Sequence, residues 1–190
     1  MCGRFSLYSI SQFLKRYNIE LDEPLKPKYN IAPTQETPVI IDGKAKMMKW
    51  GLKLKNLCIN TKIETFKQNP FFSELKRILV PADGFYEWKA KQPYRIETGE
   101  VFSFAGLTYQ DRFSIITMPP TKEISRLHDR MPAVLQDEDR WLNQGNIEPQ
   151  QNFKIYPVSS KVNNVKNEGK ELINPVLSNT GRSQCHLSLP

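Results

Sequence analysis

The chain has 190 residues, 39% of them hydrophobic, and a formal net charge of +7, which fits one soluble globular domain with a sizeable core. It contains no run of 18 apolar residues and no basic-then-apolar leader, so we expect neither a transmembrane span nor a secretory signal. The three cysteines, Cys2, Cys58 and Cys185, show no CxxC spacing. This argues for a reducing cytoplasm and against a zinc site, and we expect no metal and no cofactor. We expect Cys58 to be a small buried hydrophobe.

The positive charge comes from 27 basic and 20 acidic residues, with an isoelectric point near 9.3. Such a balance favours a polyanionic partner, most simply a nucleic acid, although a lysine-rich solvated surface explains it equally well. The lysines are scattered along the chain. We therefore expect any nucleic acid to bind a folded surface, and we expect the protein to be a monomer.

Three segments predict short helices. Residues 9–18 place apolar side chains on one helical face. Asn69, followed by Pro70, predicts an N-cap that opens a helix over 71–77. Asp137 predicts a cap for a third helix around Trp141.

Strand-like runs outnumber the helices. They cover residues 38–42, 46–52, 77–82, 93–98, 101–107, 113–118 and 153–158. Gly43 and Gly99 predict hairpin turns. This pattern indicates an α+β domain over residues 1–177, built on an antiparallel, barrel-like sheet with short peripheral helices. Residues 178–190 are polar and without a period, and we expect a flexible tail.

Cys2 follows the initiator Met1 and is small enough for methionine removal. The mature chain would then begin with an amine and a thiol on adjacent carbons, which together convert an aldehyde into a five-membered thiazolidine. The two groups titrate at about 8 and about 8.5 in model peptides, so modest tuning would expose a nucleophile at pH 7. By itself, a Cys at position 2 is more often a coincidence.

Glu87 lies among aromatic residues. In an extended 85–88 segment it shares a face with Phe85, while Tyr86 and Trp88 share the other. Loss of solvation would raise the pKa of Glu87 toward values useful in proton transfer. His128 is one of only two histidines. Taken singly, Glu87 is better interpreted as a surface glutamate and His128 as a loop histidine.

Seven motifs occur in a fixed order: MCGRF, YNIAPTQ, WGL, LVPADGFYEW, FAGL, HDRMP and YPVSSKVNNVKNEG. Over nearly the whole chain they resemble the SRAP family, the abasic-site processing proteins of the SOS response. The resemblance implies a single SRAP-type domain that acts on abasic sites in single-stranded DNA and forms a stable crosslink through its N-terminal cysteine. It also implies a possible thiol autopeptidase activity that removes the residues before that cysteine.

The resemblance assigns roles position by position. It implies catalytic roles for Cys2, Asn60, Glu87 and His128. It implies DNA contacts for Arg4, Trp50, Lys62 and Arg130, with Trp50 either stacking on the DNA or packing as an ordinary core residue. Lys62 stands where the family's NARSE-like segment has an arginine, so we expect weaker phosphate contact there. Several connections also look shorter than is usual in the family.

The expected reaction follows from the lesion. An abasic sugar is mostly a closed hemiacetal, and we expect His128 to supply the proton that opens its ring. We expect Glu87 to accept and release the proton of the Cys2 amine, and Asn60 to orient the sugar or the Cys2 backbone. Two other classes stay open. One is a thiol autopeptidase or N-terminal-nucleophile hydrolase that uses the same residues, and the other is a non-catalytic nucleic-acid-binding module.

Overall fold

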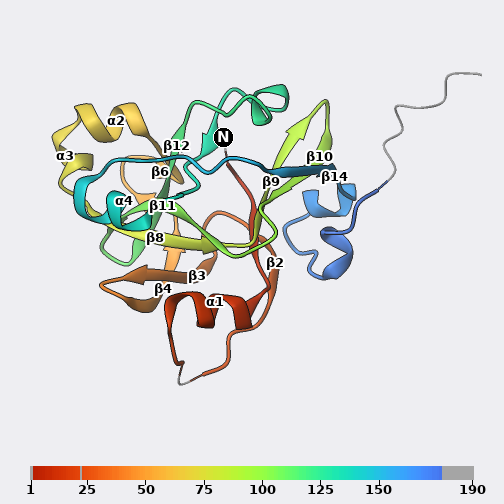
Figure 1. The fold of residues 1–190 in the computed structure, drawn as a ribbon, viewed down its shortest axis with the longest axis horizontal. Coiled ribbons are helices and arrows are strands. Elements are labelled where there is room, and N and C mark those ends of the chain that lie inside the picture. Colours follow the sequence, from red (N-terminus) through yellow and green to blue (C-terminus); the bar gives the residue numbers. More distant parts are fainter. Residues whose placement is uncertain (1, 22, 177–190) are drawn as a thin grey trace, which may run out of the picture.

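The computed structural model describes residues 2–21 and 23–176 (Figure 1). Its centre is a ring of five strands in the order β11-β8-β3-β4-β12, closed because β11 also pairs with β12. The strands are β3 (Glu36–Ile41), β4 (Lys44–Trp50), β8 (Lys76–Ala82), β11 (Phe102–Tyr109) and β12 (Arg112–Met118). The predicted barrel-like sheet with short helices is thus confirmed, and the boundary predicted at 177 lies outside the described residues.

The ring is not purely antiparallel. A closed ring with an odd number of strands must contain at least one parallel neighbour pair, and here β4 runs parallel to β12. β7 (Asn60–Lys62) continues this parallel pairing, with Ile115 opposite Asn60 and Thr117 opposite Lys62. β13 (Met131–Pro132) pairs with the same end of β12. The end of β12 therefore collects two segments that are distant in the sequence.

A second sheet has the strand order β14-β10-β9-β1-β2. Its strands are β1 (Phe5–Leu7), β2 (Lys28–Ile31), β9 (Gly84–Lys89), β10 (Gln92–Glu97) and β14 (Lys154–Pro157). Only Asp83 separates β8 in the ring from β9 in this sheet. Phe5 packs edge-on against Trp50 and Phe104, with ring centroids 5.0 and 5.7 Å away, so one continuous core joins the two sheets.

Only one of the two glycines predicted to form hairpin turns does so. Gly43 (φ +72°) lies in the hairpin turn between β3 and β4, as predicted. Gly99 (φ +93°) instead connects β10 of one sheet to β11 of the other, so the hairpin predicted there is wrong. The β9–β10 hairpin turns at Ala90 and Lys91, both with positive φ. Residues other than glycine give no local signal for such a turn.

The helices are short, as predicted. α1 (Ile10–Tyr17) buries Phe13, and α4 (Glu138–Gln144) is capped by Asp137, whose side chain accepts from the backbone N–H of Arg140 at 2.9 Å. Asn69 likewise caps α3 (Pro70–Ser73), which follows α2 (Ile63–Gln68). The helix predicted over 71–77 is too long, because residues from Lys76 onward pair with β11.

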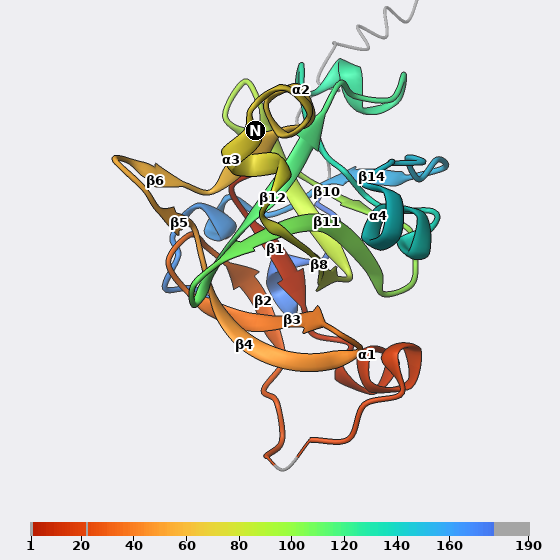
Figure 2. The ribbon, with the colours of Figure 1, turned by 90° about the vertical axis from the view of Figure 1, so that its left-hand side faces the viewer.

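Smaller elements complete the chain. β5 (Leu52–Lys53) and β6 (Leu57–Cys58) form a two-stranded ribbon that projects from the barrel (Figure 2). Three 3-10 turns cover Ile124–Arg126 (η1), Ser160–Asn163 (η2) and Lys170–Leu172 (η3). No helix among the described residues is long and apolar enough to cross a membrane.

Candidate active site

Cys2 lies directly before β1 and is fully buried. Phe5 pairs with Phe85, and the backbone N–H of Tyr86 donates to the carbonyl of Arg4 at 3.0 Å. The start of the chain therefore runs beside the part of β9 that contains Glu87. Burial and then the charge of Glu87 raise the pKa of the Cys2 thiol. In the chain that retains Met1, the thiol is therefore shifted away from ionisation, and the tuning expected for a terminus that begins at Cys2 stays a prediction.

Asn60 holds the backbone of Cys2. Its side-chain Nδ2 donates to the Cys2 carbonyl at 2.8 Å, and β7 fixes its own backbone against Ile115 of β12. Its Oδ1 atom is buried and has no hydrogen-bond partner within the described part of the chain. Buried acceptors are usually satisfied, so this atom is available to a donor brought by a ligand or by a changed chain terminus.

Glu87 is 2% exposed and shows the predicted alternation. Phe85 belongs to the main core, whereas Tyr86 and Trp88 pack in a second cluster with Val158. Burial raises the pKa of Glu87 to about 7, although the charge of the N-terminal ammonium lowers it, and the charge of Asp129 adds to the rise. Its Oε1 atom also lacks a hydrogen-bond partner among the residues described. Near neutral pH, this carboxyl group can therefore both accept and release a proton.

His128 lies in the loop after η1, with its side chain 30% exposed. Its Nδ1 accepts the backbone N–H of Arg130 at 3.0 Å and lies 2.7 Å from Oδ1 of Asp129. The first contact requires an unprotonated Nδ1, and the second is attractive when Nδ1 carries a proton. Because the charge of Asp129 acts on Glu87, the structure brings this loop to the β9 side of the site.

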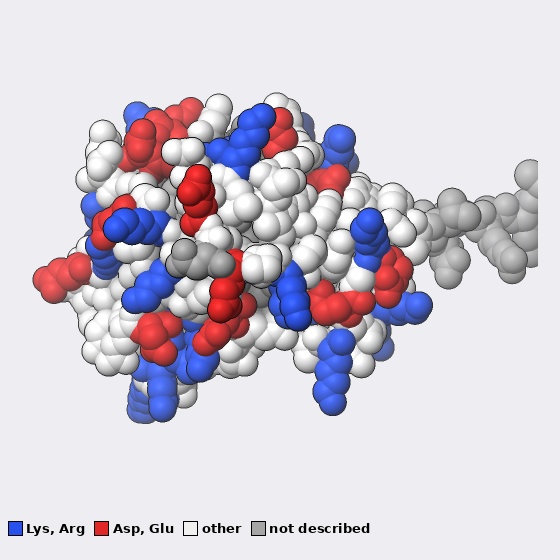
Figure 3. Space-filling model, turned by 90° about the horizontal axis from the view of Figure 1, so that it is seen from below, with Lys and Arg blue, Asp and Glu red and all other residues white. Residues whose placement is uncertain are grey.

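The predicted DNA contacts have different surroundings. Lys62 is exposed. Arg130 is largely covered, and its two terminal nitrogens donate to Glu64 at 2.8 and 2.9 Å. Arg4 uses Nη1 to donate to Asn30 Oδ1 at 2.8 Å and to the Val162 carbonyl at 2.7 Å. Both arginines thus hold the protein's own segments together. The surface in Figure 3 shows basic and acidic side chains interspersed, in line with the scattered lysines of the sequence.

Trp50 is fully buried, and its indole N–H donates to the Ile59 carbonyl at 2.8 Å. It has no exposed face on which a base could stack, so the predicted DNA contact is wrong and the core alternative holds. The half-exposed aromatic ring near the site is that of Trp88, over which Arg4 lies at 6.0 Å. Sequence reasoning gave Trp88 no role beyond its place on the strand face opposite Glu87. Cys58 is only half-buried, contrary to prediction.

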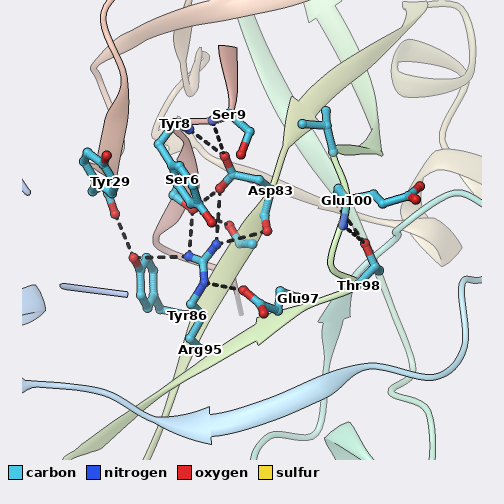
Figure 4. Close-up of polar contacts among 12 residues, drawn as sticks. Ser6, Tyr8, Ser9, Tyr29, Asp83, Tyr86, Arg95, Glu97, Thr98 and Glu100 are labelled. Carbon is cyan, nitrogen blue, oxygen red and sulfur yellow. Dashed lines mark hydrogen bonds and ion pairs between the residues drawn. The ribbon is translucent and has the colours of Figure 1, made fainter. Parts of the chain in front are cut away.

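A buried ionic network fixes β1, and through it Cys2 (Figure 4). Arg95 is fully buried and donates to the carbonyl of Asp83 at 3.0 Å, to its Oδ1 at 3.2 Å and to Ser6 Oγ at 2.8 Å. The other carboxylate oxygen of Asp83 accepts the backbone N–H groups of Tyr8 and Ser9 at 2.6 and 2.9 Å. The PADG stretch of the sequence thus anchors the segment that follows the candidate nucleophile.

Gly84 is part of this arrangement. A Cβ atom at this position would lie 2.4 Å from Nη2 of Arg95, so only glycine lets the guanidinium pass. Among residues 2–21 and 23–176, no three His, Cys, Asp or Glu side chains form a group that could hold a metal ion.

The chain matches a family model and is similar in sequence to known bacterial proteins. The family model described as SOS response associated peptidase (SRAP) matches residues 1–165. The abasic site processing protein YoqW of Bacillus subtilis is 34% identical, covering 91% of this chain and 99% of that protein. YedK of Escherichia coli, with the same description, is 31% identical and covers 93% and 100%. The YoqW alignment spans 222 positions, more than this chain contains, so this chain lacks some of the positions that YoqW has.

Solved structures agree on the fold. A protein from Bacteroides thetaiotaomicron superposes with a TM-score of 0.77 at 21% identity, covering 93% of this chain and all of that one. A phage-related protein from Bordetella bronchiseptica gives 0.65 at 27% identity, with coverage of 83% and 94%. The family match over most of the chain and the two bacterial relatives above 30% identity lead to one conclusion: this chain belongs to the SRAP family.

Proposed function

We propose that this chain processes abasic sites in single-stranded DNA by linking them covalently to Cys2 after removal of Met1. The relatives named above are described as abasic site processing proteins. The observation that supports the chemistry best is the setting of Cys2, whose carbonyl is held by Asn60 and whose thiol senses the charge of Glu87. Asn60 and Glu87 each keep one buried acceptor without a partner in the described chain. A free ammonium group on Cys2 supplies donors for such acceptors.

The reaction proceeds through two bond-forming steps. The abasic sugar opens to its aldehyde when His128 gives a proton to the departing ring oxygen. The Cys2 amine attacks the aldehyde carbon, and loss of one water molecule leaves an imine. The Cys2 thiol then adds across the C=N bond, forming the S–C bond and returning a proton to nitrogen. The product is a thiazolidine whose mass is that of protein plus DNA minus one water.

The pKa shifts support this order of steps. With its pKa raised to about 7, Glu87 accepts the proton that the Cys2 ammonium must lose before it can attack. The buried thiol remains protonated, so the amine is the first nucleophile and sulfur follows once the imine exists. A buried, protonated thiol also makes a resting thiol peptidase the weaker alternative.

Ring closure protects the DNA. An imine at C1′ acidifies the neighbouring C2′ proton and promotes β-elimination, which breaks the strand. Fast addition of the thiol removes the imine before this occurs. An unpaired abasic sugar needs no unstacking before it enters a pocket, which accounts for a single-stranded substrate. Lys62 is exposed, and in this proposal it contacts a phosphate beside the lesion.

Intact mass measurement tests the proposal. Purified protein, first shown by mass to lack Met1, is mixed with a single-stranded oligonucleotide that contains one abasic site. We expect a heat-stable adduct of the summed mass minus one water, which Cys2→Ala abolishes. Cys2→Ser should give no equally stable ring. A complex that dissociates on heating or in high salt would instead identify a non-catalytic binding module, and an undiminished adduct in Cys2→Ala would falsify the thiazolidine.

A further inference from the structure

Glu64 lies four residues after Asn60, in the first turn of α2, and has no role in the reaction described above. Its two carboxylate oxygens accept both terminal nitrogens of Arg130, at 2.8 and 2.9 Å. This bidentate arrangement fixes the orientation of a guanidinium as well as its position. The same Arg130 donates from Nη2 to the Thr117 carbonyl at 2.7 Å, and its backbone N–H donates to Nδ1 of His128 at 3.0 Å.

The topology shows what this ion pair joins. β7, which contains Asn60, pairs with β12 up to Thr117. β13, which follows the His128 loop, pairs with β12 at Thr117 and Met118. The two segments thus attach to the same end of one strand, and the pair between Glu64 and Arg130 ties them directly to each other.

Burial and charge both stabilise the ion pair between Glu64 and Arg130. The Arg130 side chain is only 15% exposed, so without Glu64 a mostly covered cation would lose its counter-charge. Hydrogen bonding to Arg130 lowers the pKa of Glu64 to about 2, so the carboxylate stays ionised throughout the neutral range. While the pair is closed, Arg130 cannot present both terminal nitrogens to a phosphate.

We propose that Glu64 is a positioning residue that acts through Arg130, holding the 128–130 loop against β7 so that His128 stays aligned with Asn60 and Cys2. The proposal rests on the function proposed above for His128. It gives Arg130 a role in positioning the loop, in addition to the DNA contact that the family resemblance implies for it. We call the Glu64–Arg130 ion pair the clamp. Misplacing a catalytic group by about 1 Å can cost up to about 100-fold in rate, so loss of the clamp should slow adduct formation measurably.

Single-turnover kinetics test the clamp with four variants: Glu64→Gln, Arg130→Lys, the double variant, and Glu148→Gln as control. Glu148 pairs with Arg140 at 2.9 Å in an exposed ion pair at the far end of α4. At saturating abasic DNA, we expect Glu64→Gln to slow adduct formation about tenfold with an unchanged salt dependence of binding. Because lysine cannot form the bidentate pair, Arg130→Lys should slow adduct formation to a similar extent. The double variant should form the adduct no more slowly than either single variant.

The imidazole NMR signals give a second measurement that needs no DNA. The chain has only two histidines, His128 and His186, so the spectrum is simple. We expect Glu64→Gln to move the His128 imidazole signal and Glu148→Gln to leave it unchanged.

Two results would overturn the clamp. One is tighter DNA binding by Glu64→Gln with a steeper salt slope and an unchanged saturated rate, which would mean that Glu64 merely competes with phosphate for Arg130. The other is an unmoved His128 signal. If wild-type protein forms no adduct, the proposed function fails, but the NMR comparison still decides whether Glu64 positions His128.

Discussion

The side chain of Asn60 and the backbone carbonyl of Cys2, 58 positions apart in the sequence, share a hydrogen bond of 2.8 Å. Asn60 is anchored by the parallel pairing of β7 with β12, and Cys2 by the strand β1 that follows it. The bond therefore fixes the candidate nucleophile, which precedes a strand of the second sheet, relative to the barrel.

Replacing Asn60 by Ala should slow adduct formation without changing its product. The Cys2 carbonyl loses its donor, and the amine samples more orientations before it meets the aldehyde. We expect a rate loss between tenfold and about 100-fold at saturating DNA, with an adduct of unchanged mass. Rapid-quench gels measure the rate and intact mass the product. A wild-type rate would show that the bond does not align Cys2 for attack.

Glu87→Gln should stabilise the folded protein at high pH. The pKa of Glu87 is about 7 when folded and 4.5 in the reference state, so the folded chain holds an extra proton between these values. Native stability therefore falls as the pH rises from 4.5 to 7, and then levels off. Gln removes this penalty, so its advantage should grow from near zero at pH 4 to about 3 kcal/mol at pH 8.

Urea unfolding across pH 4–8 measures this difference. The stability of the wild type and of Glu87→Gln is compared in the chain that retains Met1. The N-terminal ammonium already lowers the pKa of Glu87 in this chain, and removal of Met1 changes that contribution, so the size of the advantage of Gln should differ in the chain that begins at Cys2. A difference that stays constant with pH in both chains would mean that Glu87 does not titrate near neutrality.

His128→Ala should slow both formation and reversal of the adduct. Opening the sugar ring needs a proton on the departing oxygen, and reclosing it moves the same proton backward. The final thiazolidine should be identical to that of the wild type. Time courses on denaturing gels at pH 5–9 follow both directions. Wild-type rates in both directions would make His128 a structural residue and require another acid.

Asp83→Ala should destabilise the fold by about 3 kcal/mol, the low end of the cost of breaking a buried ion pair, because the buried cation of Arg95 keeps only Glu97 as a counter-charge. The change also removes the acceptor of two backbone N–H groups that start α1. Glu148→Gln, which breaks an exposed ion pair, should cost less than about 1 kcal/mol. Urea midpoints of the two variants provide the comparison, and equal losses would contradict the role of the network.

Lys62→Ala should reduce the slope of log affinity against log salt by about 0.7, the contribution of one phosphate on a single strand. Lys62→Arg should keep the slope and bind more tightly, because its planar fork can contact a phosphate at two points. Lys44→Ala, at the β3–β4 turn, is the matched control and should leave the slope unchanged. Fluorescence anisotropy over a salt series measures all three, and an unchanged slope in Lys62→Ala removes this contact.

Sequence alone was enough for the helix caps and for the strand alternation around Glu87. Asn69 and Asp137 were recognisable as caps because a cap depends on a few neighbouring residues. The strand alternation around Glu87 was readable from the period of two, and the collinear motifs led to the family.

The tertiary structure decided whatever depends on remote partners. The burial of Trp50, the burial of the Cys2 thiol and the link between Arg130 and Glu64 all arise from segments that meet only in the folded barrel. Gly99 carries the same local turn signal as Gly43, yet it joins two sheets, because strand partners are chosen by the packing of the whole domain. Solvation and charge depend on neighbours in space, so motifs could name the site residues but not their protonation or their partners.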